Sequence, residues 1–125
     1  MVDLNELQAH FNTCMPLFIA LGDEVRLTII EALTHAAFGR LEGSGIQNTR
    51  AGIKGMNVME ITKKTNLSRP AISHHLKILK DAGLVGIQKE GTSNYYYMTI
   101  QSSTEQLMNL GSMLQECLKE KSLSV

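Results

Sequence analysis

Apolar residues recur every three or four positions through the first segment of the chain, which is the spacing of one face of an α-helix. This pattern predicts a helix from about Asp3 to Leu21. Pro16 lies inside it and lacks a backbone donor, so we expect either a kink or two helical pieces that meet at Met15 and Pro16. The apolar positions of this helix are Leu4, Leu7, Phe11, Cys14, Phe18 and Leu21.

A second helix is predicted after the break at Gly22. Asp23 is a favourable N-cap residue, and Glu24 lies in the first turn, where the helix dipole favours negative charge. The pattern continues to about Ala37 with a wide apolar face. Such a face is typical of a helix that packs on a core along one side.

Two shorter helices are predicted in the centre of the chain, separated by a tight turn at residues 66–67. The first begins with Asn57 as N-cap and Glu60 three residues later, the arrangement of a capping box. It extends to about Thr65. Its expected buried residues are Val58, Ile61 and, at the margin, Met59.

The second helix of this pair begins at Ser68, whose hydroxyl can cap it. Pro70 lies in the first turn, where its missing donor is not needed, and Gly83 marks the end of the helix. Helical spacing places one apolar ridge toward the core. This ridge consists of Ile72, Leu76 and Leu79.

Residues 84–89 and 94–100 are rich in β-forming types and flank a glycine-containing turn, which predicts a hairpin. Residues 54–56 are candidates for a short strand beside it. Helix, turn, helix, glycine stop and hairpin follow one another in the order of a winged helix-turn-helix. The expected fold is therefore mainly α with a small β-hairpin (α+β), in one domain over residues 1–125.

A last helix is predicted from Ser102 to about Lys121, with an apolar stripe as narrow as that of the first helix. Two helices from opposite ends of a small chain, each too apolar for solvent along one seam, indicate a helical dimer interface. The residues expected in it are Leu4, Leu7, Phe11, Leu107, Leu110, Leu114 and Leu118.

A glycine-rich insertion separates the second predicted helix from the central pair, at about residues 38–56. It holds half of the ten glycines and has no clear period. A loop of this length in a small domain is usually either functional or disordered. Two interpretations stay open: a mobile solvated loop, or a contact with a ligand, a partner or DNA backbone through Arg40, Arg50 or Lys54.

The formal net charge of the 125 residues is zero, which at first argues against a nucleic-acid partner. The distribution is informative: Lys63 to Lys89 carries six cationic residues against the single acid Asp81, a net charge of +5. Phosphate contacts need local rather than total positive charge. No apolar run approaches a membrane span and no signal-peptide pattern begins the chain, so we expect a cytoplasmic protein.

The exposed positions of the second central helix are short polar and cationic side chains, which suit base edges and phosphates in a major groove. Flanking lysines, including Lys80, either contact phosphates or form an ordinary solvated face. Tyr95 is the hairpin tyrosine expected to reach a phosphate. The candidate DNA-binding residues are Ser68, Arg69, Ser73, His74 and Lys77, with Lys63 and Lys64 beside them, and Lys89, Thr92, Ser93 and Tyr95 on the hairpin.

The two cysteines, Cys14 and Cys117, lie at opposite ends of the chain and have no metal-ligand spacing. Each falls on an apolar stripe, where a free thiol ordinarily behaves as a small hydrophobe. The sharper hypothesis is a redox pair, because the first and last helices are expected to lie together. A Cα separation well beyond about 7 Å would rule out a direct bridge.

The segment from Leu67 to Val85 resembles the reading helix of the ArsR family of bacterial winged-helix repressors. Residues 20–30, with an Asp-x-x-Arg-Leu core, are similar to a helix of that family, and the hairpin that ends in Tyr95, Tyr96 and Tyr97 also fits. The resemblance implies a homodimer joined by its first and last helices. It also implies a palindromic double-stranded DNA operator and repression relieved by a ligand.

The chain departs from the metal-sensing members of that family. Asn57 and Met59 stand where such members often carry a Cys-x-Cys pair, and the last predicted helix has no histidine. We therefore predict no metal and no cofactor, and leave the effector unidentified.

The sequence thus predicts a dimeric transcriptional repressor. The alternative is a winged-helix module that binds protein and no operator. An enzyme is not expected, because no nucleophile-base arrangement, phosphate loop or paired carboxylates stand in a recognisable setting.

Overall fold

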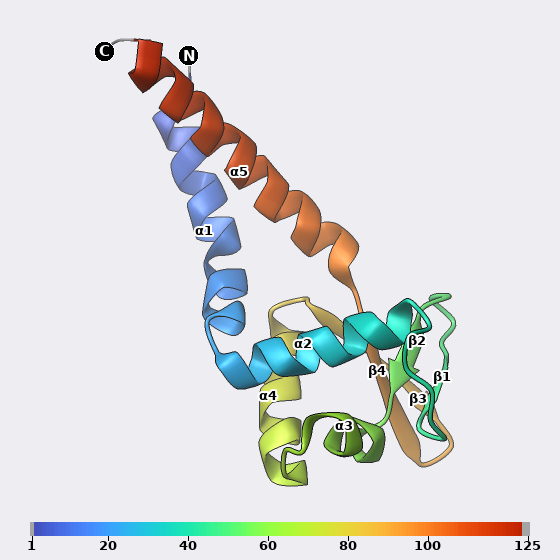
Figure 1. The fold of residues 1–125 in the computed structure, drawn as a ribbon. Coiled ribbons are helices and arrows are strands. Elements are labelled where there is room, and N and C mark those ends of the chain that lie inside the picture. Colours follow the sequence, from blue (N-terminus) through green and yellow to red (C-terminus); the bar gives the residue numbers. More distant parts are fainter. Residues whose placement is uncertain (1, 124–125) are drawn as a thin grey trace.

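A computed structural model describes residues 2–123, in which the first and last helices project as an arm from a body formed by the other elements (Figure 1). The elements are α1 (Leu4–Leu21), α2 (Glu24–Ala37), β1 (Ile46–Asn48), β2 (Lys54–Met56), α3 (Val58–Thr65), α4 (Arg69–Asp81), β3 (Val85–Glu90), β4 (Ser93–Met98) and α5 (Ile100–Leu123). The predicted order of helices and hairpin is confirmed. No helix among the described residues is both long and apolar enough to span a membrane.

The arm pairs the first and last helices, as the two apolar stripes predict. Asp3 caps α1 by accepting from the backbone N–H of Asn5 at 2.8 Å. α1 continues through Pro16 as one helix, so the alternative of two helical pieces is excluded. The thiol of Cys14, 1% exposed, donates to the carbonyl of Gln106 at 3.4 Å, which is one contact between the two helices.

The body places α2, α3 and α4 against one face of a sheet. The apolar ridge predicted for α4 is confirmed: Ile72 and Leu79 are fully buried and Leu76 is 1% exposed. They share a core with Leu33 of α2 and Ile61 of α3. Met59 departs from the prediction, because it is 55% exposed, while Val58 is half-buried.

The sheet is larger than the predicted hairpin. It has four strands in the order β1-β2-β4-β3, all antiparallel. The strand expected at residues 54–56 is confirmed as β2, which pairs Met56 with Tyr96 of β4. β1 was not predicted: a strand of three residues is too short to show a period of two.

The insertion is therefore not a solvated loop throughout. Its second half is a β1–β2 hairpin that adds to the sheet, and its first half packs against α3 through Glu60. Gly43 and Gly45 pass so close to the Glu60 side chain that a Cβ at either position would overlap it. This close approach explains part of the glycine content of the segment.

Candidate nucleic-acid interface

The start of α4 is built by three local features of the sequence. Asn66 takes up a left-handed conformation (φ 58°) that ends α3 and reverses the chain. The hydroxyl of Ser68 accepts from the backbone N–H of Ala71 at 3.4 Å, and Pro70 occupies the first turn. α3 and α4 are thereby held at the short separation of a helix-turn-helix.

The polar residues predicted to read DNA all lie on the solvent side of α4, opposite its buried ridge. Since the N-terminal part of the second helix enters the major groove in this motif, they are available for bases and phosphates. These exposed residues are Ser68, Arg69, Ser73, His74 and Lys77.

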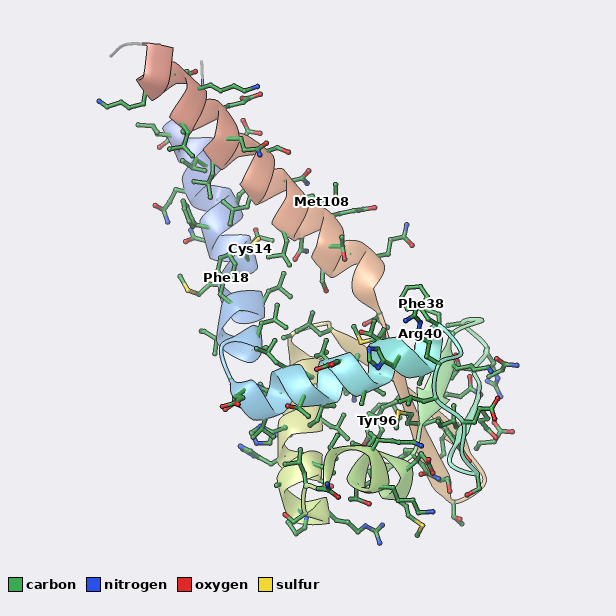
Figure 2. The ribbon with its side chains drawn as sticks, viewed as in Figure 1. Cys14, Phe18, Phe38, Arg40, Tyr96 and Met108 are labelled. Atoms are coloured by element: carbon green, nitrogen blue, oxygen red, sulfur yellow. The ribbon has the colours of Figure 1, made fainter. Side chains whose placement is uncertain are left out.

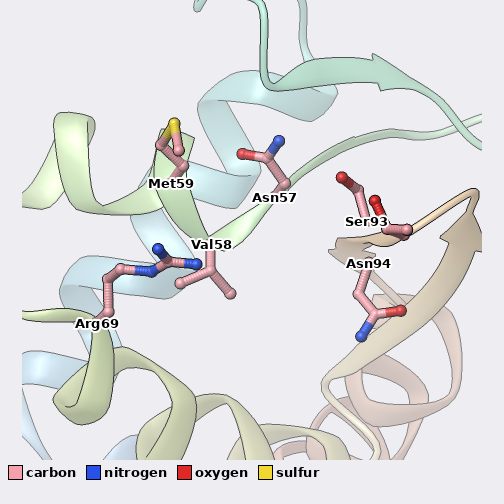
Figure 3. A pocket seen from close by; sticks show the side chains of 7 residues that line it. Asn57, Val58, Met59, Arg69, Ser93 and Asn94 are labelled. Atoms are coloured by element: carbon pink, nitrogen blue, oxygen red, sulfur yellow. The ribbon is translucent and has the colours of Figure 1, made fainter.

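A groove of about 240 Å³ separates the start of α4 from the tip of the β3–β4 wing. Figure 3 shows the guanidinium of Arg69 on one side and the side chains of Ser93 and Asn94 on the other, with the start of α3 forming the end wall. The lining is mostly polar, and a guanidinium and hydroxyl groups are suitable donors to a phosphodiester. The groove therefore joins the reading helix and the wing into one surface.

The wing tip presents Lys89, Thr92 and Asn94 to solvent, and Ser93 is half-exposed. Tyr95, the tyrosine expected to reach a phosphate, is only 9% exposed, so little of its ring is open to a phosphate. Successive side chains of a strand point to opposite faces, and its neighbour Tyr96 is the one that packs against the core. Tyr96 is half-buried, and desolvation raises the pKa of its hydroxyl above 10.0.

The two lysines of α3 differ in environment. Lys63 is exposed to solvent, so it is available to a phosphate. Lys64 instead pairs with the buried carboxylate of Glu60 at 3.6 Å and donates to the carbonyl of Glu42 at 3.1 Å. Lys64 thus holds the insertion against α3, and its charge is already partnered within the chain.

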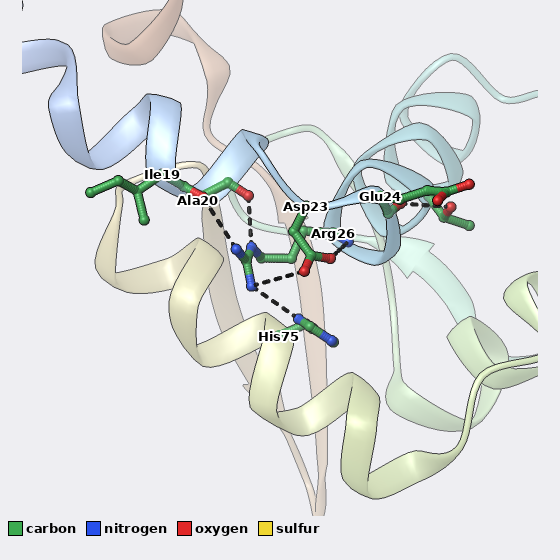
Figure 4. A network of polar contacts seen from close by, with 7 residues as sticks. Ile19, Ala20, Asp23, Glu24, Arg26 and His75 are labelled. Atoms are coloured by element: carbon green, nitrogen blue, oxygen red, sulfur yellow. Dashed lines mark hydrogen bonds and ion pairs between the residues drawn. The ribbon is translucent and has the colours of Figure 1, made fainter.

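Arg26 connects the reading helix to the arm, a role that the sequence analysis did not assign (Figure 4). Its guanidinium donates to the carbonyls of Ala20 at 2.7 Å and Ile19 at 3.2 Å, at the end of α1. It also lies 3.2 Å from Nδ1 of His75 on α4. Because arginine is only a donor, a hydrogen bond between them requires Nδ1 of His75 to be the acceptor.

Asp23 completes this network. Its carboxylate accepts from the backbone N–H of Arg26 at 3.1 Å and lies 3.8 Å from the Arg26 guanidinium. The backbone hydrogen bond, followed by the positive charge of Arg26, lowers the pKa of Asp23 below its ordinary value of 3.8. The Asp-x-x-Arg spacing was visible in the sequence, but its connection to His75 depends on the fold.

The predicted dimer residues fall into two groups. Leu110 is 3% exposed and belongs to the core of the single chain, and Leu7, Phe11 and Leu107 are partly buried against that core. The remaining residues are exposed on the arm: Leu4 (72%), Leu114 (36%) and Leu118 (67%). Figure 2 shows the arm with Phe18 and Met108, which are also exposed.

Both cysteines are free thiols. Cys14 meets α5 at Gln106, and Cys117 lies eleven residues farther along that helix, which is about 16 Å at 1.5 Å per residue. This is beyond the range of a disulfide within one chain, so the predicted direct bridge between Cys14 and Cys117 is wrong for the single chain.

The two positions compared with metal ligands have other environments. The Asn57 side chain caps α3 by accepting from the backbone N–H of Glu60 at 2.9 Å, and Met59 is exposed. Within residues 2–123, no group of three or more His, Cys, Asp or Glu side chains is arranged to hold a metal ion.

A helix-turn-helix followed by a β-wing, with exposed polar and cationic side chains on the second helix, defines a winged-helix DNA-binding protein. The sequence pattern of the bacterial regulatory proteins of the arsR family matches residues 54–86, from β2 to the start of β3. An uncharacterised HTH-type transcriptional regulator of Methanocaldococcus jannaschii is 39% identical over 82 residues, 66% of this chain and 73% of that protein.

Two further proteins resemble this chain, the first in sequence and the second in fold. The transcriptional repressor SdpR of Bacillus subtilis is 35% identical over 57 residues, 43% of this chain and 63% of SdpR. The solved structure of an ArsR-like transcriptional regulator from Rhodococcus sp. RHA1 superposes with a TM-score of 0.61 at 22% identity, covering 92% of this chain and 94% of that one. The chain belongs to the arsR family, and it is a DNA-binding transcriptional regulator.

Proposed function

We propose that this regulator is a homodimeric repressor that binds a palindromic operator and leaves it in response to a signal. The observation that carries the proposal is the continuous surface formed by the exposed face of α4, the 240 Å³ groove and the wing tip. A surface of this kind can place α4 in a major groove while the wing follows the adjacent backbone.

The contacts divide by chemistry. Ser68, Ser73 and His74 carry short groups with donors and acceptors, which suit base edges. The cationic residues suit phosphates, since positive charge supplies much of the affinity but little sequence information. These cationic residues are Arg69, Lys77, Lys63 and Lys89, with Thr92 and Ser93 as hydroxyl donors at the wing.

The exposed apolar residues of the arm support the dimer. Leu4 and Leu118 stand in solvent in the single chain, where large apolar side chains are unfavourable unless a partner covers them. A second copy related by a two-fold axis would cover both arms and hold two reading helices at a fixed spacing. The spacing would match operator half-sites about one helical turn apart.

Repression is proposed because the relative SdpR is a transcriptional repressor. A dimer that covers an operator excludes other proteins from it. Release by a ligand would then require a site whose occupation favours a conformation with lower DNA affinity.

Selection of bound duplexes from a random pool tests the proposal. A palindromic product supports the dimer and the reading helix together, and a product without symmetry contradicts them. The affinity for the selected duplex should fall steeply with salt, because each phosphate contact releases counterions. The absence of any enriched duplex would instead favour the second candidate function, a winged-helix module that binds protein and no operator.

Arg69→Ala should weaken binding to the selected duplex about tenfold and lower the salt slope by about one. Arg69 is exposed, so the variant should keep its thermal midpoint. Lys119→Ala is the matched control, because Lys119 is also an exposed cation but lies on α5 of the arm, away from α4. Equal affinities of the two variants, measured by fluorescence anisotropy, would show that the assigned reading face is wrong.

A further inference from the structure

A small apolar cavity lies where α2 ends, between the turn of the β1–β2 hairpin and the end of β4. Its volume is about 210 Å³. An engineered cavity of about 150 Å³ in another protein holds benzene, so there is room here for one ring. The lining residues are Thr34, Ala37, Phe38, Gly52, Ile53 and Met98.

The end of α2 forms one wall. The backbone N–H of Phe38 donates to the carbonyl of Thr34 at 3.1 Å, which fixes Phe38 as the C-cap of α2. The Phe38 side chain, labelled in Figure 2, is nevertheless 73% exposed although it lines the cavity. An aromatic ring held in water next to an apolar hollow can gain contact area when the hollow is filled.

The hairpin turn forms the opposite wall and is closed by its own hydrogen bonds. The Thr49 hydroxyl donates to the carbonyl of Ile53 at 2.6 Å, and the Gly52 N–H donates to the carbonyl of Thr49 at 2.9 Å. The backbone N–H of Arg50 also donates to the side chain of Gln88 on β3. Ile53 is thus held in place by a turn that is anchored to the wing.

The chemistry of the lining restricts the ligand. Among the described residues that line the cavity, none has a charged side chain, and the hydroxyl of Thr34 is the only polar side-chain group. This hydroxyl donates to the carbonyl of Ile30 at 2.7 Å, so it can offer only an acceptor to a ligand. The cavity fits a small uncharged apolar molecule with at most one donor.

The cavity lies beside the segment that joins the DNA-binding wing to the arm. Met98 is the last residue of β4, whose other end is the wing tip, and α5 of the arm begins two residues later. Met98 is 4% exposed and lines the cavity. A molecule that contacts Met98 therefore contacts the connection between the DNA-binding wing and the arm.

We propose that this cavity is the signal-binding site, which takes a small uncharged aromatic or aliphatic molecule and changes the affinity of the regulator for DNA. The binding part is independent of the proposed function, and the regulatory part rests on it. Coupling between the two sites is reciprocal, so DNA and ligand affect each other's affinity by the same factor.

Methyl NMR tests the binding part, because Ala37, Ile53 and Met98 all carry methyl groups. Protein with ¹³C-labelled Ala, Ile and Met methyls is titrated with benzyl alcohol and with indole. We expect saturable shifts of these three methyls with one common dissociation constant for at least one probe. The absence of such shifts with both probes overturns the proposal.

Ala37→Leu fills the cavity from the end of α2 and should abolish the shifts of Ile53 and Met98. Ala51→Leu is the matched control, since Ala51 lies in the β1–β2 turn beside the cavity but is exposed and does not line it. Shifts that persist in Ala37→Leu overturn the assignment. If that variant does not fold, Ile53→Asp, which places a carboxylate in the apolar wall, replaces it, and the shifts of the Ala37 and Met98 methyls should then be lost.

The regulatory part is read from affinity for the selected duplex. A saturating probe should change the affinity of the wild-type protein about fivefold or more and leave that of Ala37→Leu unchanged. An unchanged wild-type affinity with a bound probe overturns the signalling role. If no duplex is selected at all, the proposed function fails, while the methyl titration still decides whether the cavity binds.

Discussion

At the scale of single residues, Arg26 shows how one side chain can position a DNA-reading helix. Its guanidinium binds two carbonyls at the end of α1 and the ring of His75 on α4. His75 makes an edge contact with His74, at a ring separation of 5.4 Å, and His74 faces solvent on the reading surface. Arg26, His75 and His74 therefore form a chain of side-chain contacts from the end of α1, in the arm, to the reading surface.

Replacement of Arg26 by lysine keeps the charge but removes the planar fork that reaches three acceptors. We expect Arg26→Lys to lower the free energy of unfolding by about 2 kcal/mol, the scale of lost hydrogen bonds to a charged group, and to weaken DNA binding. Urea unfolding and fluorescence anisotropy measure the two effects. Arg40→Lys is the control at an exposed position; equal unfolding free energies of the two variants would contradict the role of Arg26.

Asp23 leads to a prediction about pH. The folded state lowers the pKa of its carboxyl below 3.8, so the ionised form stabilises the fold above this value and the contribution is lost as the pH falls through the folded pKa. Asp23→Asn keeps a capping oxygen but has no charge. The variant should be less stable than the wild type in urea at pH 7, and the difference should shrink as the pH falls below 3.8 and disappear below the folded pKa. A difference that stays constant with pH would contradict an electrostatic contribution.

At the scale of elements, the insertion shows where local patterns stop being informative. Residues 54–56 could be assigned as a strand because the wing beside them was already predicted. β1 could not, since its pairing with β2 comes from a turn whose hydrogen bonds are not evident in a glycine-rich sequence. Glu60 was expected only as part of a capping box, yet it is 3% exposed and accepts from the Gly45 N–H at 3.3 Å.

Glu60→Ala should release the first half of the insertion from α3. It leaves the buried Gly45 N–H without its acceptor and Lys64 without its carboxylate, at a cost of about 1–3 kcal/mol. Hydrogen exchange at Gly45 and Ile46 should accelerate. Glu42→Ala is the control, because Glu42 is exposed and contributes its backbone carbonyl to Lys64. Equal exchange rates in both variants would mean that the glutamate does not anchor the segment.

At the scale of the whole molecule, the arm combines two kinds of leucine along one helix. Leu110 is part of the core of the single chain, whereas Leu118 is 67% exposed. The sequence stripe that contains both predicts an apolar seam but does not distinguish contacts within the chain from contacts with a second copy. The packing of α1 against α5 makes this distinction.

Leu118→Glu should convert the proposed dimer to a monomer without unfolding it, because the charge enters only the uncovered part of the arm. Sedimentation velocity measures the change, and circular dichroism confirms the fold. Leu110→Ala is the contrasting variant: a cavity in the core should cost about 2–5 kcal/mol of stability. A dimeric Leu118→Glu protein would place the interface elsewhere.

Local patterns in the sequence determined the helices, their caps, the turn at Asn66 and the polar face of α4, because these depend on residues within a few positions of one another. Tertiary structure alone decided the burial of Tyr95, the anchoring of the insertion by Glu60 and Lys64, and the bridge from Arg26 to His75. It also separated Cys14 from Cys117. Each of these contacts joins residues far apart in the chain, and only the packing of the elements brings such residues together or keeps them apart.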